Sequence, residues 1–378
     1  MKLALSLLSL RPGQVGGAET YVRQLVARLP GVAAPGDRLV LVMDRDLAAA
    51  LETPGWERLV VPRSARGVVI ARLLEAFTPW RDRAVERLLA GVGADVTLFP
   101  QQSIYPRRAP GRAVLTVVDV QHLYQPELIP AVERAFRAAV YPASMARAEH
   151  LVAISEFTRR TVLERCGVTP ERVTAIPLGY EPRDASAVTP TDRVAGPYLY
   201  YPAATFAHKN HATLIRSYAA LRRRGDLAEK LVLTGMQTPA WKALARLARE
   251  LGVAGDVVHL GFLPYPETRR VYAGAAAVVF PSRYEGFGIP VLEAAVEFQR
   301  KVITSRLPVF DELGVPPERQ IDFADPDALL AALRLEGPTI LARRPSTWEE
   351  CARRTMEVLR ATAQRPPAQA GAARAGIV

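Results

Sequence analysis

Lysine and cysteine are scarce in this chain of 378 residues. The 49 basic residues outnumber the 38 acidic ones by 11, and only five of the 49 are lysine. Arginine and alanine dominate in the way that a GC-rich genome produces, so the net charge alone does not require a nucleic-acid partner. The two cysteines, Cys166 and Cys351, form no CxxC, no zinc-ligand spacing and no disulfide framework. We therefore expect a reducing, cytoplasmic location.

Other familiar signals are also missing. The chain has no run of the roughly 18–20 apolar residues that cross a membrane. The opening MKLALSLLSL lacks a small-residue cleavage site, so we expect a buried first strand rather than a signal sequence. The four tryptophans are scattered, which disfavours a single-strand nucleic-acid platform. No GxGxxG follows the first strand, which disfavours a dinucleotide-dependent dehydrogenase.

Short apolar runs alternate with amphipathic helical stretches along the chain, and the series restarts after a linker rich in Pro, Ser and Asp at 181–197. This pattern predicts an α/β protein with two Rossmann-like, doubly wound parallel sheets. We expect domains at 1–185 and 186–346, a helix at 347–365 that packs back on the first domain, and a disordered tail at 366–378. Ligands bind at the carboxyl ends of strands in such sheets, here in a cleft between the two domains.

The sharpest motif runs from Glu285 to Glu293 and follows an apolar strand. Gly286 and Gly288 allow a tight turn and a close approach to a ligand, and Pro290 suits the start of a helix. Backbone N–H groups at a helix start stabilise phosphate or sugar oxygens. A glycine-rich connector with two solvated glutamates is the bland alternative.

A second motif, His208–Asn210, lies between a predicted strand and a predicted helix. Its Lys209 is one of the few lysines, and an ammonium group at such a loop is a natural anchor for phosphate. The alternative is an ordinary exposed lysine. The pair Gly16–Gly17 after the first strand is a weaker signal of the same kind.

Together, and in this order, these motifs resemble those of the retaining glycosyltransferases of family 4, which have the GT-B architecture of two Rossmann-like domains. The resemblance covers roughly residues 1–365. It implies that Glu293 holds the ribose of a nucleotide-sugar donor and that Glu285 and the amides of Gly286–Gly288 hold the sugar. It also implies that Lys209 neutralises the diphosphate as the nucleotide departs.

The resemblance further implies that no cofactor and no metal is needed, because positive side chains and a helix start replace the metal. The acceptor then attacks the face that the nucleotide leaves, so no protein nucleophile is required. The predicted donor site comprises Lys209 and Glu285 as catalytic residues, with His208, Asn210, Arg283, Gly286, Phe287, Gly288, Ile289 and Glu293 as binding residues.

The chain departs from the family pattern at three places. Ala203 stands where the family often has an arginine, so a second cation must come from Arg283 or His208. Val118–Asp119 replaces a frequent His-Asp pair, and His122 is the nearby candidate for the lost sugar contact. We therefore place Gly16, Gly17, Asp119 and His122 in the cleft of the first domain. Glu297–Arg300 replaces the usual small turn after the helix.

Two clusters imitate metal sites. Asp44-Arg45-Asp46 resembles the D-x-D of metal-dependent glycosyltransferases with a single Rossmann domain, but we expect a helix start enriched in aspartate. His208 and His211 lack a third ligand, so a zinc site is not expected. His150 and His259 lie beside apolar strands and are expected to be packed.

The segment Arg58–Arg87 carries seven arginines against Glu75, Asp82 and Glu86. Such a basic, amphipathic stretch can lie on an anionic membrane and meet a lipid-linked acceptor, which would make the protein peripheral at the inner face of the cytoplasmic membrane. An ordinary solvated helix face is the alternative.

Three functions therefore stay open at this level. The leading one is a transferase that moves a hexose from GDP-mannose or a UDP-sugar to a saccharide or lipid-linked acceptor in cell-surface polysaccharide biosynthesis. The others are a non-transferase enzyme of the same architecture, such as a sugar-nucleotide epimerase or a phosphorylase, and an inactive scaffold that binds nucleotide sugars. The donor base, the acceptor and the oligomeric state carry no readable signal.

Overall fold

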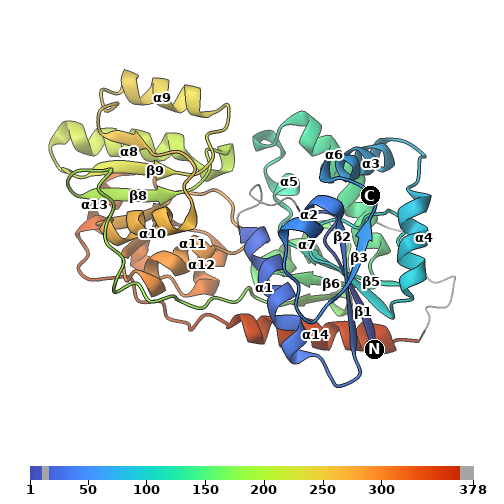
Figure 1. Ribbon diagram of the computed structural model, residues 1–378. Coiled ribbons are helices and arrows are strands. Elements are labelled where there is room, and N and C mark those ends of the chain that lie inside the picture. The colour runs from blue at the N-terminus through green and yellow to red at the C-terminus, as the bar shows by residue number, and fades with distance from the viewer. Residues whose placement is uncertain (11–16, 367–378) are drawn as a thin grey trace. The chain divides into compact units, whose positions relative to one another are not determined.

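The computed structural model describes residues 1–10 and 17–366, and it divides into two compact units (Figure 1). The first unit holds Met1–Gly179 and the segment that begins at Ser346, and the second holds Tyr180–Pro345. The boundary falls a few residues before the predicted 185/186, inside the proline-containing stretch that follows the last strand of the first unit. The predicted tail lies, from residue 367 on, outside the described residues.

A parallel sheet forms the centre of the first unit. Its described strands follow the order β3-β2-β1-β4-β5-β6-β7, and every neighbouring pair is parallel. The strands are β1 (Lys2–Ser6), β2 (Arg38–Asp44), β3 (Glu57–Val61), β4 (Val96–Phe99), β5 (Arg112–Val117), β6 (His150–Ala153) and β7 (Val173–Ala175). Edge strand β3 has mostly exposed side chains and no buried apolar run, so it lacks the pattern that predicts the other strands of this sheet.

Helices join these strands and cover the sheet. They are α1 (Gly17–Val32), α2 (Arg45–Ala50), α3 (Ala65–Phe77), α4 (Arg83–Val92), α5 (Gln121–Tyr124), α6 (Ala131–Arg147) and α7 (Glu156–Arg165), with short 3-10 turns η1 (Pro126–Leu128) and η2 (Pro170–Arg172). The chain later returns as α14 (Trp348–Gln364), which packs against α1 in this same unit.

The return of the chain requires a glycine. A Cβ atom on Gly179 would lie 2.4 Å from the backbone of Trp348, closer than side-chain carbons approach other atoms. The backbone that leaves the first unit and the start of α14 are therefore in direct contact. A capping box of Thr347 and Glu350 fixes the helix start at that point.

The second unit contains a parallel sheet of the same kind. Its described order is β10-β9-β8-β11-β12-β13, made of β8 (Tyr198–Pro202), β9 (Lys230–Thr234), β10 (Val257–His259), β11 (Ala277–Phe280), β12 (Lys301–Ser305) and β13 (Gln320–Ile321). Its helices are η3 (Ala207–Lys209), α8 (His211–Arg224), α9 (Trp241–Glu250), α10 (Tyr265–Gly274), α11 (Ile289–Leu292), the π-helical η4 (Glu293–Glu297), α12 (Pro308–Leu313), η5 (Pro317–Arg319) and α13 (Pro326–Arg334). The two-residue β13 was not predicted.

The order of the strands locates the place for a ligand. In each sheet the chain winds outward in both directions from a central pair, which is β1 and β4 in the first unit and β8 and β11 in the second. Nearly all side chains of these central strands are buried, because helices cover both faces of a parallel sheet. Ligands in such sheets bind beyond the carboxyl ends of the central pair. The motif that contains Lys209 follows β8, and the motif from Glu285 to Glu293 follows β11. Both motifs therefore lie where a ligand is expected to bind.

Candidate functional site

Lys209 and Glu285 meet beyond the central strands of the second unit. Lys209 follows β8 at the end of η3, and Glu285 follows β11 on the loop to α11. The ammonium Nζ of Lys209 donates to Oε1 of Glu285 at 2.6 Å. Their side chains are 21% and 17% exposed, so the ion pair is half-buried and still reachable from solvent. The sequence-predicted catalytic residues are therefore neighbours, although 76 positions separate them.

Hydrogen bonds lock the two loops together. The backbone N–H of Arg283 donates to the carbonyl of His208 at 2.8 Å, and the side-chain amide of Asn210 donates to the carbonyl of Pro281 at 3.1 Å. The buried Tyr201 hydroxyl donates to the Lys209 carbonyl and lies 2.9 Å from the Ser282 hydroxyl. Together these bonds tie strand β8, the loop after it and the loop after β11 to one another. The backbone of Lys209 is thus held in place before any ligand arrives.

The local conformation of the lysine loop explains its sequence. Asn210 adopts the left-handed region with φ 58°, which asparagine tolerates better than most residues, and its Oδ1 accepts a hydrogen bond from Thr213. On the other side, a Cβ on Gly235 would come within 2.7 Å of the Ala204 backbone. The loop after β9 therefore packs directly against the loop that carries Lys209.

Opposing effects act on the Glu285 carboxyl. Burial raises its pKa, but the charge and hydrogen bond of Lys209, together with the Ser282 hydroxyl, outweigh burial and hold the pKa below its usual range. Glu285 is consequently ionised at neutral pH. A carboxylate that accepts from an ammonium can also accept from sugar hydroxyls, so the pair offers both a cation and an acceptor at one place.

The glycine turn after β11 differs in detail from the expected helix start. Gly288 has φ 119°, and a Cβ there would lie 3.1 Å from Leu313, so this position requires glycine. Only four residues, Ile289–Leu292, are α-helical, with Pro290 in the first turn, and the helix continues as the π-helix η4. Phe287 is buried in the packing below the turn. Helices with π turns are frequent at functional sites.

Glu293 lies in a different environment from Glu285. It is the first residue of the π-helix, and its Oε2 accepts a hydrogen bond of 3.0 Å from the Tyr272 hydroxyl. Burial, and to a smaller extent the charge of Glu297, raises the Glu293 pKa from 4.5 to about 7, against the lowering effect of Tyr272. A partly protonated carboxyl at neutral pH is common at functional sites.

Glu297 is a residue that the sequence analysis named only as a departure from the family pattern. Its side chain is 1% exposed, and it accepts from Nε of Arg269 at 2.9 Å and from the Tyr180 hydroxyl at 2.8 Å. The backbone N–H of Arg183 donates to the same carboxylate at 3.2 Å. Glu297 thus ties α10 and the chain at 180–183 to the π-helix that carries Glu293. In the sequence, the only sign of this role was that Glu297 stands where the family usually has a small turn.

In the first unit, the predicted residues lie beyond β5. Asp119 accepts from the Gln121 amide at 3.0 Å, and the carboxamide of Gln102 bonds the backbone of Val118 and Asp119. His122 is buried, and its ring meets the Tyr141 ring edge-on at 5.2 Å. Burial lowers the His122 pKa, so the imidazole is neutral. Of the glycine pair, Gly17 begins α1 and Gly16 lies outside the described residues.

The residues that imitate metal sites in the sequence have structural roles. Asp44 is the buried N-cap of α2 and accepts from the Leu47 amide at 2.9 Å, and Asp46 accepts from the Ala65 amide, as a helix start enriched in aspartate predicts. Across 1–10 and 17–366, no group of three or more His, Cys, Asp and Glu side chains is placed to hold a metal ion. His150 and His259 are largely buried, which lowers their pKa values to about 4.

Solved structures share this architecture. Sucrose-phosphate synthase from Thermosynechococcus elongatus matches over 96% of both chains with a TM-score of 0.63 and 17% identity. The Anabaena protein HepE, solved with UDP and glucose, matches over 96% of this chain and all of its own with a TM-score of 0.62 and 18% identity. WaaG, a glycosyltransferase of lipopolysaccharide biosynthesis, gives 0.58 at 19% identity over 94% of this chain and 95% of its own. The fold is therefore GT-B, the two-domain class of glycosyltransferases.

The family follows from the sequence of each unit. Residues 192–335 match the family described as Glycosyl transferases group 1, and residues 15–184 match Glycosyltransferase Family 4. The two matches together cover most of the chain and support a GT-B glycosyltransferase of group 1, as the motifs predict.

Curated relatives match over part of their length. O-antigen chain mannosyltransferase B of Escherichia coli is 27% identical over 195 residues, which is 48% of this chain and 50% of the relative. The O-antigen chain mannosyltransferase RfbU of Salmonella typhimurium is 24% identical over 199 residues, 53% of each chain. The chain thus spans about half the length of the curated relatives it matches.

Proposed function

We propose that this protein transfers a hexose, with mannose as the leading candidate, from a nucleoside-diphosphate sugar to a saccharide or lipid-linked acceptor with retention of configuration. The observation that carries the proposal is the Lys209–Glu285 pair beyond β8 and β11. Family membership and the names of the O-antigen mannosyltransferases support a hexosyl donor and a role in cell-surface polysaccharide biosynthesis. GDP-mannose and UDP-sugars both remain candidate donors, since HepE holds UDP and glucose.

In the proposed reaction, Lys209 supplies the positive charge that the leaving diphosphate requires. When the glycosidic C–O bond breaks, the electron pair goes to the diphosphate oxygen, and the ammonium group that the locked loops carry stabilises that charge. Donor binding would release Lys209 from Glu285 toward the phosphates and leave the Glu285 carboxylate to accept from sugar hydroxyls. Arg283 or His208, on the same joined loops, would supply the second cation.

Glu293 is proposed to hold the ribose hydroxyls as an acceptor, with Tyr272 orienting the carboxyl. No protein nucleophile is needed, because the acceptor oxygen attacks the face from which the nucleotide leaves and a phosphate oxygen takes its proton. We further propose that the reaction is independent of metal and cofactor, and that it takes place in the cytoplasm, at the inner face of the membrane reached through Arg58–Arg87. No helix within the described residues is long and apolar enough to span a bilayer.

The test is a panel of nucleotides and nucleotide sugars, first by thermal shift and then by donor turnover with and without added EDTA. A selective rise in melting temperature identifies the base, because ligands that bind only the folded state stabilise it. Lys209→Ala and Glu285→Gln should lower turnover about 100-fold or more. Lys242→Ala, which removes an exposed lysine from α9, should keep the wild-type turnover.

Two outcomes would contradict the transferase proposal. Release of an epimerised nucleotide sugar without any acceptor would favour an epimerase. Donor binding without turnover on any saccharide or lipid-linked acceptor would favour an inactive scaffold. Loss of turnover in EDTA that Mg²⁺ restores would contradict metal independence alone.

A further inference from the structure

The outward face of helix α3 in the first unit is apolar. Its side chains have exposed fractions between 39% and 59% for Val69, Ile70, Leu73, Leu74 and Phe77. The loop that follows adds Trp80, which is 39% exposed. With 3.6 residues per turn, these helical positions fall on one side, together with Arg66. We call Val69, Ile70, Leu73, Leu74, Phe77 and Trp80 the α3 face.

A surface helix usually buries its apolar side and exposes its charges. Helix α3 buries Val68 and Ala71 but also buries an acid and leaves a second apolar stripe exposed. Glu75 of α3 is buried, with 4% exposed, while its neighbour Leu74 is 41% exposed. The Glu75 carboxylate accepts from the backbone N–H groups of Asp82 and Arg107 at 2.9 and 2.7 Å. The acid therefore fixes the loops behind the helix, and the leucines lie in solvent. Contiguous exposed apolar side chains mark an interaction surface.

The same arrangement makes the surrounding surface basic. All three acids of the segment 58–87 are used inside the protein. Besides Glu75, the buried Asp82 accepts from Arg63 and from the Tyr105 hydroxyl, and Glu86 pairs with Arg81 at 2.5 Å. Arg66 is exposed on α3 itself, and Arg83 and Arg87 are exposed on α4, the next helix along the chain, so the segment presents positive charge to solvent.

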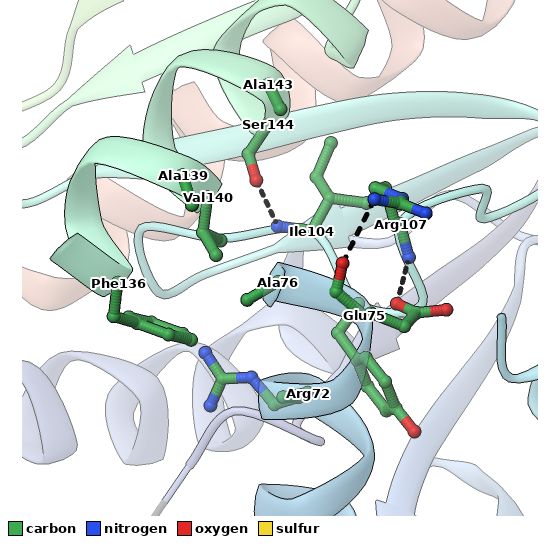
Figure 2. A pocket seen from close by; sticks show the side chains of 11 residues that line it. Arg72, Glu75, Ala76, Ile104, Arg107, Phe136, Ala139, Val140, Ala143 and Ser144 are labelled. Carbon is green, nitrogen blue, oxygen red and sulfur yellow. Dashed lines mark hydrogen bonds between the residues drawn. The ribbon is translucent and has the colours of Figure 1, made fainter. Parts of the chain in front are cut away.

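A pocket continues the α3 face toward α6. Helices α3 and α6 lie side by side, and Phe77 meets Phe136 of α6 at a ring distance of 6.5 Å (Figure 1). Phe136 also lines the pocket together with Ile104, Val140, Ala139 and Ala143, and the Arg72 guanidinium lies 5.7 Å from the Phe136 ring (Figure 2). Arg72, Glu75 and Arg107 line the same pocket, so charged and apolar groups share it where it adjoins the α3 face.

We propose that the α3 face inserts into the interface of an anionic lipid bilayer. Apolar side chains among arginines are the composition of helices that lie in the headgroup region. Anionic headgroups complement the exposed Arg66, Arg83 and Arg87. A second copy of the chain docking through the same face would instead bring these like charges together. This inference deepens the membrane part of the proposed function and does not depend on the donor chemistry.

The experiment is co-sedimentation of the full chain with vesicles of phosphatidylcholine alone and of phosphatidylcholine with phosphatidylglycerol. The protein should pellet with the anionic vesicles only. Ile70→Ser/Leu73→Ser/Phe77→Ser should weaken partitioning about 100-fold or more, and Arg66→Gln/Arg83→Gln/Arg87→Gln about 10- to 100-fold. The control Lys242→Gln/Arg246→Gln/Arg249→Gln removes the same charge from exposed positions of α9 and should bind as the wild type does.

Insertion is also visible by fluorescence. Emission of the exposed Trp80 should shift to the blue with anionic vesicles, and Trp80→Phe should lose that shift, since Trp56 and Trp348 are buried already. Equal binding to both vesicle types, wild-type binding by the α3 variants, or a dimer in solution that Ile70→Ser/Leu73→Ser/Phe77→Ser dissociates would overturn the proposal.

Donor turnover measured on the same variants separates this inference from the proposed function. The exposed α3 positions lie in the other unit from Lys209, so turnover without vesicles should stay at the wild-type level. Vesicle binding without any transferase activity would contradict the proposed function and leave the membrane surface standing. Transferase activity without vesicle binding would contradict the membrane surface and leave the proposed function standing.

Discussion

Glu285 and Glu293 belong to one motif and one unit of the fold, yet their surroundings shift the pKa values of their carboxyls in opposite directions. Lys209 lies 2.6 Å from Glu285 and lowers its pKa, whereas burial beside Tyr272 raises the pKa of Glu293 to about 7. The nearest charge to Glu293 along its own helix is the like charge of Glu297, which is itself committed to Arg269. The motif in the sequence therefore locates both acids. Which of them is ionised at neutral pH depends on Lys209, which comes from another element and pairs with Glu285.

The largest effect on activity should come from removing the Lys209 ammonium group from the Lys209–Glu285 pair. Lys209→Met removes the cation that the departing diphosphate requires, so kcat should fall about 100- to 1000-fold. It also leaves Glu285 without its ammonium, and the Glu285 pKa should rise. Lys242→Met is the matched control and should keep wild-type kcat, since Lys242 is exposed on α9. Steady-state kinetics with the donor found by thermal shift gives the answer, and unchanged kcat in Lys209→Met would remove Lys209 from the mechanism.

The second effect concerns the anchor of the Glu293 region. Glu297→Ala leaves Arg269 half-buried without its carboxylate, so the free energy of unfolding should fall by about 3 kcal/mol. The double variant Arg269→Met/Glu297→Leu should recover much of that loss, because no buried charge is then left unpaired. Urea denaturation of the three proteins measures the difference. A loss below about 1 kcal/mol in Glu297→Ala would mean that the ion pair does not hold the π-helix in place.

The third test uses pH. The folded-state pKa of Glu293 is raised from 4.5 to about 7, so the folded protein binds an extra proton between these values. The stability contributed by protonated Glu293 is complete below pH 4.5 and is lost as the pH rises through about 7. Glu293→Gln should therefore match the wild type at pH 5 and exceed its free energy of unfolding by about 1–3 kcal/mol at pH 8.5. The exposed Glu250→Gln is the control and should show no such pH-dependent gain.

The smallest effect should come from the hydroxyl that orients Glu293. Tyr272→Phe removes a hydrogen bond to the carboxyl that lowers its pKa, so the Glu293 pKa should rise further. The pH at which the Glu293→Gln advantage appears should move upward by the same amount in the Tyr272→Phe background. A downward movement would show that the hydroxyl favours the protonated carboxyl instead. Melting curves across pH 5–9 resolve the direction.

Much of the fold could be predicted from the sequence, because the strands of a parallel sheet that is buried on both faces consist of runs of apolar residues. Strand β8, with Tyr198–Pro202, and strand β11 were predicted for this reason, and the motifs after them were located by position alone. The edge strand β3 and the short β13 were missed, since neither shows such a run. The π-helix after Leu292 was also missed, because the sequence periodicity there is that of any helix.

The site was predictable in its members and less so in its contacts. Lys209 and Glu285 were predicted as one site through resemblance and strand position, but their ion pair depends on the neighbouring arrangement of β8 and β11. The sequence marked Glu297 as a departure from the family pattern and Arg58–Arg87 as a basic, amphipathic stretch, but it did not predict their surroundings. The burial of Glu297 and its contacts with Arg269 and Tyr180 depend on elements far away in the chain. The exposure of Leu74 beside the buried Glu75 contradicts ordinary amphipathic expectation.

The packing of α14 against α1 has a consequence for the order in which the protein matures on the ribosome. All of Tyr180–Pro345 is synthesised before Trp348–Gln364, so the second unit has its complete sequence first. The first unit, although its sheet emerges earlier, keeps the α14-binding side of α1 uncovered until α14 itself leaves the exit tunnel. The first unit thus completes its fold only after the second unit has its whole sequence, against the usual N-terminal-first order. During that interval the side of α1 that α14 covers is the surface that a chaperone would protect.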